Sequence, residues 1–495
     1  MLVNSFVSTP DLIRFLPEII LTIMGTFLMV MDPILQRRSS YAFGHLSLLA
    51  LVGALGGSVY AYTEGGCSVP QSCPAFGGML MVDGFATFFR VLVIVVGILT
   101  VLSSYRFLQR EDAETSEYHA LLLFSIAGQC LMAASNDLIM VFIGIEISSI
   151  ASYVMAGYLR DDKRANEAAL KYFLLGSFAT AFFLYGVALI YGATGSINLS
   201  TVRGILMGPD VPSSVFIGLA AALMFVGLAF KVSASPFQIW APDVYQGAPT
   251  PVAAFLSAGP KAAAFAVFLR IFMTAFEPMS ASWQPWLFGI SALLSMVIGN
   301  FAALLQSNVK RMLAYSSIAH AGYVMVALTA RSEIGTSAAM FYLAAYAFMN
   351  VGAFAVVSHL SGKGERYQTV DDFAGLAQKQ PLTAALLTIF MLSLIGVPLT
   401  GGFFGKFYIF KAALESHLVW LTVLGLLTSA VAAYYYLRIL VMMYMHEPSK
   451  ASSEVEPLSL GLGTALMIPA IGTLFLGIFP NWVLDFAVKS ATLVK

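Results

Sequence analysis

The chain has 495 residues, of which 59% are apolar and 11% are charged, and its mean hydropathy is +0.83. An ordinary soluble protein has about 25% charged residues, so this composition excludes a soluble fold. The 26 basic and 26 acidic residues cancel, which leaves no whole-chain charge to attract nucleic acid. We therefore interpret the chain as an integral membrane protein.

Apolar runs longer than about 18 residues recur along the chain, and each can cross a bilayer core of about 30 Å. They predict an all-α polytopic fold of about fourteen membrane spans. The run at 118–158 is too long for one span, and Ser135, Asn136 and Asp137 supply a turn within it. The start of the chain lacks the basic segment of a cleaved signal peptide, so we expect the first span to remain. The predicted spans are 15–35, 43–62, 82–104, 118–136, 137–158, 169–195, 214–245, 250–273, 284–305, 310–330, 336–360, 381–411, 418–444 and 458–486.

The basic residues of the connections predict the orientation, because Lys and Arg collect in short loops that face the cytoplasm. With these spans they fall in odd-numbered connections, whereas the even-numbered ones hold little beyond Arg203 and Arg331. This alternation places the N-terminus in the periplasm. The basic residues concerned are Arg37, Arg38, Arg106, Arg110, Arg160, Lys163, Arg164, Lys310, Arg311, Lys363, Arg366, Lys379 and Lys450.

The three cysteines, Cys67, Cys73 and Cys130, are too few for an iron–sulfur cluster, which usually takes four thiolates. The sequence also contains no glycine-rich nucleotide motif and no HExxH zinc motif. We therefore expect no redox cofactor, nucleotide or metal in this chain. Cys67 and Cys73 share the second connection, in the oxidising periplasm, where a local disulfide and two free thiols are both open.

Four charged residues stand out because they lie inside predicted spans, several residues from the nearest loop: Glu146, Lys231, Lys261 and Lys406. Each costs about 2.5–3.5 kcal/mol at the centre of a spanning helix on insertion scales, so each needs a reason. Desolvation disfavours the charged form of lysine, so a buried lysine can load and release a proton near neutral pH. A nearby Glu146 would hold Lys231 protonated, and screening of that carboxylate would release the proton. A lone Glu–Lys pair could instead only pin two helices together, but one carboxylate cannot neutralise three lysines.

Helix-breaking residues accompany two of these lysines. Residues Ser233 to Pro236 follow Lys231, and the glycine-rich segment 396–402 precedes Lys406. Broken backbone at membrane depth occurs where it is buried in protein or lines a watery cavity, and paired broken helices are typical of transporters. The breaks fall in spans seven and twelve, five spans apart, which predicts two repeats of five helices each. Because five is an odd number, the second repeat must be inverted in the membrane relative to the first. The predicted domains are 1–117 for spans one to three, 118–273 and 284–444 for the repeats, and 445–495 for the last span.

Further polar residues are candidates for a proton relay between the lysines: His320, Tyr315, Tyr323 and Lys171. A relay and ordinary packing are equally open for His320, which lies in mid-span with serines and tyrosines nearby. Lys171 is close to a span end, where anchoring at the membrane surface is the default. Arg270 is placed likewise, and Asp83 and Arg90 are interpreted first as the interfacial start of the third span.

The segment from Phe230 to Phe265, FKVSASPFQIWAPDVYQGAPTPVAAFLSAGPKAAAF, resembles the core shared by the antiporter-like subunits of respiratory complex I and the Mrp-type sodium/proton antiporters. KRMLAYSSIAHAGY, from Lys310, and the GxEIxS pattern around Glu146 belong to the same superfamily. The resemblance implies that Glu146 is the carboxylate of the fifth helix and that its partner is Lys231. It also implies that Lys261 connects the two halves and that Lys406 is the exit-side lysine.

Two features make the chain most similar to the N-type subunits. M-type subunits carry a glutamate where Lys406 stands, and L-type subunits extend into a long lateral helix. The resemblance implies a proton-translocating subunit of an NADH:quinone oxidoreductase without a redox centre of its own, in a bacterial inner membrane. FMN, iron–sulfur clusters and quinone would belong to other subunits. Quinone reduction in those subunits would drive protons through this chain from the cytoplasm to the periplasm. The neighbouring subunits would be of the M and K types, and the same assembly would contain A, H, J and L types.

Other readings share the same buried residues. A self-sufficient sodium/proton antiporter would transport alone in liposomes, and a membrane scaffold would tolerate neutral substitutions at the lysines. The related membrane subunits of hydrogenases and chloroplast-type dehydrogenases differ in the electron donor, which the sequence does not specify.

Overall fold

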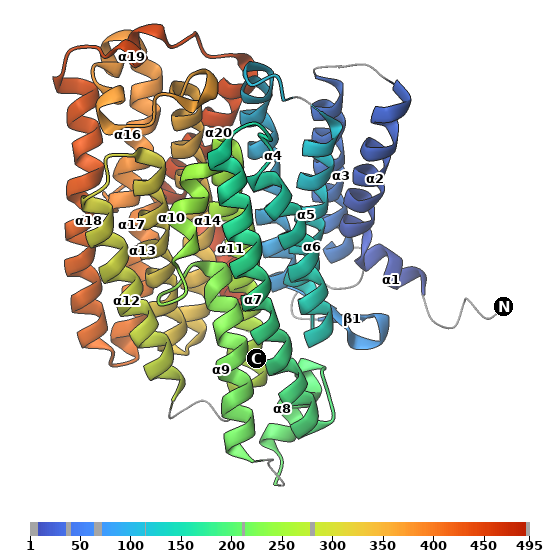
Figure 1. Ribbon diagram of the computed structural model, residues 1–495. Helices are drawn as coiled ribbons and strands as arrows, with labels where there is room; N and C mark the ends of the chain where they lie inside the picture. Colours follow the sequence, from blue (N-terminus) through green and yellow to red (C-terminus); the bar gives the residue numbers. More distant parts are fainter. Residues whose placement is uncertain are drawn as a thin grey trace.

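The computed structural model describes residues 8–35, 41–63, 72–113, 115–209, 213–277 and 283–491. Helices make up most of these ranges and run roughly parallel in one bundle, with α2 and α3 at one edge and α18 at the other (Figure 1). Eleven described helices are long and apolar enough to cross a membrane, and two shorter apolar ones accompany them. The predicted all-α polytopic membrane fold is confirmed, whereas the number fourteen and the two repeats stay predictions.

The helices follow the predicted order. The N-terminal part contains α1 (Thr9–Arg14), α2 (Leu16–Leu35), α3 (Ala42–Thr63), the strands β1 (Cys73–Ala75) and β2 (Leu80–Val82), and α4 (Gly84–Arg110). Next come α5 (Ser116–Ala134), α6 (Leu138–Ala156), α7 (Lys163–Thr194), α8 (Leu199–Met207), α9 (Ser214–Val232), α10 (Trp240–Gly247) and α11 (Thr250–Arg270). The rest comprises α12 (Gln284–Leu304), α13 (Val309–Ala330), α14 (Glu333–Leu360), α15 (Leu376–Lys379), α16 (Pro381–Ile395), α17 (Gly401–Glu415), α18 (Val419–Met445), α19 (Lys450–Glu454), α20 (Leu460–Ile478) and α21 (Asn481–Ala491).

Three helices form the centre of the bundle. The apolar windows of α11, α13 and α14 are each 94% buried, whereas those of α7 and α18 are 39% buried. Lys261 lies on α11 and His320 on α13, so these polar side chains are enclosed by protein and not by lipid. An intramembrane polar group in such a position needs protein partners.

Two spans are broken where the sequence predicts it. The first half of span seven, α9, ends at Val232 because Ser233 adopts a left-handed conformation with φ of 59°, and the second half, α10, starts at Trp240. The other break lies between α16 and α17, where Gly396 has φ of +94°. A Cβ atom at Gly402 would collide with the Ser393 carbonyl oxygen, so only glycine allows α17 to start this close to α16.

Two pairs of connections exchange backbone hydrogen bonds in the same way. Segment 136–138, between α5 and α6, exchanges two bonds of 2.9 Å with segment 197–199 before α8. Segment 307–309, between α12 and α13, exchanges bonds of 2.7 and 2.9 Å with segment 368–370 after α14. The first exchange lies beside α8 and the second near α19, at opposite ends of the bundle in Figure 1.

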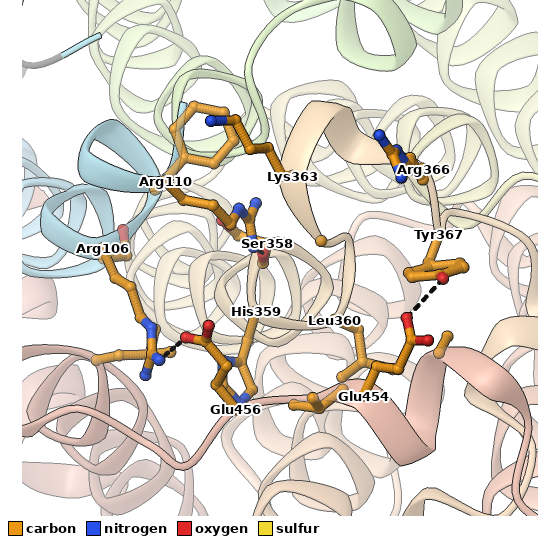
Figure 2. Close-up of a pocket in the computed structure, with 16 residues that line it drawn as sticks. Arg106, Arg110, Ser358, His359, Leu360, Lys363, Arg366, Tyr367, Glu454 and Glu456 are labelled. Carbon is orange, nitrogen blue, oxygen red and sulfur yellow. Dashed lines mark hydrogen bonds and ion pairs between the residues drawn. The ribbon is translucent and has the colours of Figure 1, made fainter. Parts of the chain in front are cut away.

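Basic residues from the odd-numbered connections meet at the α19 end of the bundle. Arg106 and Arg110 of α4 line a cavity of about 470 Å³ together with Lys363 and Arg366, which follow α14 (Figure 2). The exposed Glu456 pairs with Arg106 across its edge. The charge alternation in the sequence thus corresponds to one polar end of the fold. Arg37 and Arg38 lie outside the described residues.

The two basic exceptions in the even-numbered connections share one partner. Arg203 pairs with the Glu277 carboxylate at 2.9 Å, and Arg331 donates to the Glu277 carbonyl oxygen at 3.0 Å. Both arginines are therefore held by a local contact with Glu277.

The cysteines differ in state. Cys73 is disulfide-bonded, and Cys130 is a free, buried thiol. Cys67 lies outside the described residues.

Candidate functional site

Lys231 ends α9 at the first helix break and is buried. Its Nζ donates to Ser149 Oγ at 2.5 Å and to the Tyr153 hydroxyl at 3.3 Å, both on α6. The same Nζ lies 5.2 and 5.7 Å from the ring centroids of Tyr153 and Tyr172. Cation–π attraction and two hydroxyl oxygens therefore stabilise the ammonium without a carboxylate.

Glu146 is not the direct partner of Lys231. Across the described parts of the chain, no ion pair within 4 Å joins the two residues, so the predicted contact is absent from this structure. Glu146 lies one turn before Ser149 on α6, but the lysine reaches toward Ser149 and Tyr153 instead. Glu146 is only partly buried and lies between Ile143 and Ile147, which are exposed. The carboxylate thus sits at the rim of the outward face of α6.

Lys261 lies in the middle of α11 and is 2% exposed. Its Nζ donates to the Ser317 carbonyl oxygen at 3.0 Å and also contacts Ser317 Oγ on α13. One turn earlier on α11, Ser257 Oγ accepts a hydrogen bond of 2.6 Å from Asn350 Nδ2 on α14. The three central helices therefore meet around this lysine.

His320 has a hydroxyl partner at each ring nitrogen. Its Nδ1 lies 2.5 Å from the Tyr342 hydroxyl, and its Nε2 lies 3.2 Å from the Tyr436 hydroxyl. The Tyr436 hydroxyl also contacts Ser316 Oγ. An imidazole between two hydroxyl groups can accept a proton at one nitrogen and release one at the other.

Lys406 of α17 reaches back across the second helix break. Its Nζ donates to the carbonyl oxygens of Leu394 and Ile395, both at 2.9 Å, and to Ser429 Oγ at 2.8 Å. The carbonyl groups at the end of α16 carry the negative end of the helix dipole. Nζ also lies 5.0 Å from the Tyr323 ring centroid. The broken helix thus supplies the acceptors that a continuous helix would have used internally.

Two of the other relay candidates lie apart from these lysines. Tyr315 is half-buried, and the Arg311 guanidinium lies 5.8 Å from the Tyr315 ring centroid. Lys171 is 42% exposed at its side chain and pairs with Glu167 at 2.7 Å and with Asp243 at 2.8 Å. Their contacts favour surface roles over proton relay.

Tyr323, in contrast, belongs to a buried polar chain. Its hydroxyl accepts from Asn300 Nδ2 at 3.2 Å, and Asn300 Oδ1 accepts from the Tyr435 hydroxyl at 3.0 Å. Asn300 and Tyr435 are not predictable from the sequence, because asparagine and tyrosine in an apolar run give no signal of their own.

Two buried amide oxygens near Lys261, Gln129 Oε1 and Asn350 Oδ1, have no hydrogen-bond partner among the described atoms. Gln129 lies against α11, where a Cβ at Gly259 would be 2.8 Å from its Oε1. Buried polar atoms without protein partners are commonly satisfied by water. Both oxygens are therefore candidate water sites beside the lysine.

Three residues predicted to be interfacial, Asp83, Arg90 and Arg270, are buried in ion pairs. Arg90 pairs with Glu18 at 2.7 Å, and Arg270 pairs with Asp83 at 2.8 Å. These pairs join α2 to α4 and α4 to α11, and all four side chains are at most 7% exposed. The sequence does not reveal these partners, because they lie 72 and 187 positions away along the chain. The interfacial depth of these residues stays a prediction. Within the described ranges, no group of three or more His, Cys, Asp or Glu residues could hold a metal ion.

Comparisons with known proteins agree on one family. Residues 135–432 match the family model described as NADH:quinone oxidoreductase/Mrp antiporter, TM. The chain is 76% identical over 485 residues to NADH-quinone oxidoreductase subunit N 1 of Solibacter usitatus (strain Ellin6076), with 98% of each sequence covered.

Solved structures give the same result. A chain of respiratory complex I from Thermus thermophilus with bound aureothin is similar with a TM-score of 0.79 and 34% identity, covering 95% of this chain and 98% of that one. A chain of the membrane-bound sulfane sulfur reductase, an archaeal respiratory membrane complex, is similar with a TM-score of 0.85 and 28% identity over 97% of each chain.

Proposed function

We propose, since this chain belongs to the NADH:quinone oxidoreductase/Mrp antiporter family and within it to the N subunits of NADH-quinone oxidoreductases, that its buried lysines carry protons across the membrane. The chain is an antiporter-like subunit of the membrane arm of complex I. The proposal concerns the residues that move the proton and the direction in which it moves.

The observation that carries the proposal is a polar stripe on α13, formed by Ser317, His320 and Tyr323. These residues are three apart, so they share one face of the helix. Ser317 accepts from Lys261 at one end of the stripe, and the Tyr323 ring lies under the Lys406 ammonium at the other. His320 lies between them with two hydroxyl partners. The stripe supports a proton route from Lys261 to Lys406.

None of Lys231, Lys261 and Lys406 has a carboxylate within ion-pair distance in the described ranges. With neutral partners only, each lysine can exchange its proton without leaving an unpaired carboxylate in the interior. Lys231 loads Lys261 in this proposal, and the water sites near Gln129 and Asn350 would bridge the gap between them.

Protons enter from the cytoplasm and leave to the periplasm in this proposal. The orientation rests on the basic cavity of Figure 2, since basic connections face the cytoplasm. His359 and Ser358 line that cavity from α14, which also carries Asn350 toward Lys261. We therefore place proton entry at this end, the N-terminus in the periplasm, and the chain in a bacterial inner membrane.

The domain and partner assignments extend the proposal. The two matching loop exchanges support inverted repeats at 118–273 and 284–444. The exposed apolar rim around Glu146 supports a neighbouring subunit on α6, which would supply the charge that reaches Lys231. M-type and K-type neighbours are proposed on the membrane arm, together with A, H, J and L types. FMN, iron–sulfur clusters and quinone are assigned to other subunits.

The test compares Lys406→Ala with Lys411→Ala in inverted membrane vesicles, with assembly checked on a native gel. Lys411 lies on the same helix but is half exposed and pairs only loosely with Glu415, so it is a matched control. We expect Lys406→Ala to lower proton pumping and quinone reduction by about 10²-fold per assembled complex, the scale of a lost proton-transfer group. Pumping at the control rate in assembled Lys406→Ala would overturn the proposal. Sodium transport by the isolated chain in liposomes would favour the free antiporter instead.

A further inference from the structure

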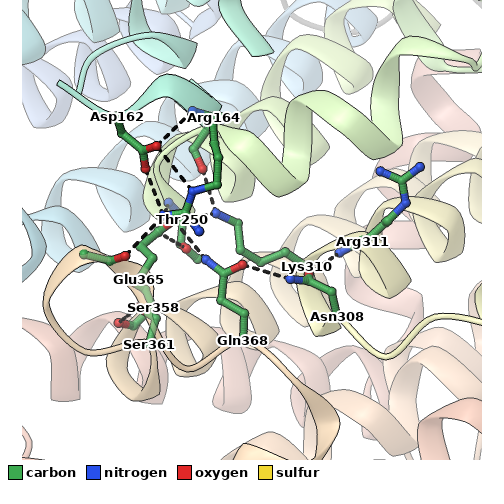
Figure 3. A network of polar contacts seen from close by, with 12 residues as sticks. Asp162, Arg164, Thr250, Asn308, Lys310, Arg311, Ser358, Ser361, Glu365 and Gln368 are labelled. Carbon is green, nitrogen blue, oxygen red and sulfur yellow. Dashed lines mark hydrogen bonds and ion pairs between the residues drawn. The ribbon is translucent and has the colours of Figure 1, made fainter. Parts of the chain in front are cut away.

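Glu365, in the connection after α14, is a buried carboxylate with four polar contacts (Figure 3). Its Oε1 accepts the Thr250 backbone N–H at 2.8 Å and also contacts Thr250 Oγ1. Its Oε2 accepts from Lys310 Nζ at 2.8 Å and from Gln368 Nε2 at 3.2 Å. Lys310 is fully buried as well, so this is an interior ion pair.

Lys310 and Glu365 together hold both sides of one short connection. Lys310 Nζ also donates to the Ala248 carbonyl oxygen at 2.7 Å. Ala248 follows the last residue of α10, and Thr250 is the first residue of α11. We call residues 248–250 the elbow. The ion pair thus binds the elbow by a backbone carbonyl on one side and a backbone N–H on the other.

The elbow lies between two lysine-bearing segments. The broken span of α9 and α10 carries Lys231, and α11 carries Lys261 three turns after Thr250. A carboxylate at the start of α11 also favours that helix end, where unpaired N–H groups and the positive end of the dipole lie. Any shift of the elbow would therefore move Lys261 relative to Lys231.

Glu365 belongs to the second predicted repeat, whereas the elbow belongs to the first. Its connection is itself fixed from two other helices. Arg110 of α4 donates to the Ser361 hydroxyl at 3.1 Å, and Arg164 of α7 donates to the Gly364 carbonyl oxygen at 3.2 Å. The carboxylate is therefore held by a fixed frame and in turn fixes the elbow.

We propose that Glu365 is a positioning residue for proton transfer, which holds the elbow through Lys310 and Thr250 and thereby sets Lys261 relative to Lys231. The proposal rests on the proposed function above. Stability alone does not explain the pair, because buried ion pairs can often be replaced by apolar residues without loss. Each member of the pair also binds the elbow backbone, Glu365 at the Thr250 N–H and Lys310 at the Ala248 carbonyl oxygen.

The test measures the rate of proton pumping in inverted vesicles, normalised to assembled complex. In Glu365→Gln the new amide nitrogen meets a donor in either orientation, the Lys310 ammonium or the Thr250 N–H, so the elbow shifts. We expect a loss of about tenfold in pumping, since a misplacement of about 1 Å can cost up to about 10²-fold. If unpaired Lys310 prevents assembly, Lys310→Met combined with Glu365→Gln removes both charges. That double variant still lacks the bond to Ala248, so we expect it to assemble and to pump poorly.

The matched control is Asp112→Asn. Asp112, which follows α4, pairs at 2.8 Å with Lys363, which lies in the same connection as Glu365. Both side chains are exposed, so the same carboxylate-to-amide change should leave pumping unaltered. A wild-type pumping rate in assembled Glu365→Gln or in the double variant would overturn the positioning role. Failure of the double variant to assemble would overturn it too, by making the pair a folding requirement. Lys261→Ala in the same assay separates the hypotheses: if it pumps normally, the proton route itself is wrong.

Discussion

Lys261 donates from its Nζ to the Ser317 carbonyl oxygen at 3.0 Å, and this contact joins two of the most buried helices of the bundle. Ser317 begins the polar stripe on α13 that continues through His320 to Tyr323. The Lys261 ammonium thus contacts one end of the stripe, the His320 imidazole lies in its middle, and the Tyr323 ring at the other end lies under the Lys406 ammonium.

His320 is expected to relay protons and not only to fill space. His320→Leu introduces an apolar side chain of similar size and removes both contacts to Tyr342 and Tyr436. We expect proton pumping per assembled complex to fall by about 10²-fold, the lower range for a lost acid–base group. The control is His417→Asn, because His417 is exposed and has a positive φ that asparagine tolerates. Equal pumping in the two variants would make His320 a packing residue.

The buried pair of Glu18 and Arg90 should matter for assembly and not for proton transfer. Glu18→Ala leaves the Arg90 guanidinium unpaired in the interior, which costs about 3–5 kcal/mol. We expect the amount of assembled complex on a native gel to fall, with normal pumping from what remains. Glu18→Gln combined with Arg90→Met should restore assembly. A normal amount of complex in Glu18→Ala would show that the pair is dispensable.

Gly402 should tolerate no side chain. A Cβ there meets the Ser393 carbonyl oxygen, so Gly402→Ala must push α17 away from α16, at a cost of about 1–3 kcal/mol. Thermal denaturation of the purified complex should show the loss, and Lys406 should lose its carbonyl contacts with it. Gly463→Ala is the control, because nothing lies within 4 Å of a Cβ at that position and glycine costs a helix about 0.5–1 kcal/mol relative to alanine. Equal stability of the two variants would argue against the close approach.

Features that carry a high local cost were predictable from the sequence. Lys231, Lys261 and Lys406 stand out because a charge in an apolar run is expensive, and the structure buries all three. The break after Lys231 follows from Ser233 and Pro236, and the break before Lys406 follows from its glycines. The turn between α5 and α6 follows from Asp137, whose side chain accepts from the first N–H groups of α6.

Partners distant in sequence were not predictable in this way. Tyr342 and Tyr436 reach His320 from 22 and 116 positions away, and tyrosine in a membrane helix is too common to indicate a relay. Lys310 looked like a loop charge, because its buried partner Glu365 lies in a polar connection. The expected contact of Glu146 with Lys231 failed since several hydroxyl and aromatic groups on α6 can also hold an ammonium.

The most direct test of the central claim is the pumping rate of the double variant Lys261→Ala with Lys406→Ala, compared with each single variant in assembled complex. The account places both lysines on one route through the α13 stripe, and residues that act as a unit lose function non-additively. It therefore predicts that the double variant pumps no more slowly than the worse single variant. Losses that multiply in the double variant would mean that the two lysines serve independent routes, and would contradict the account.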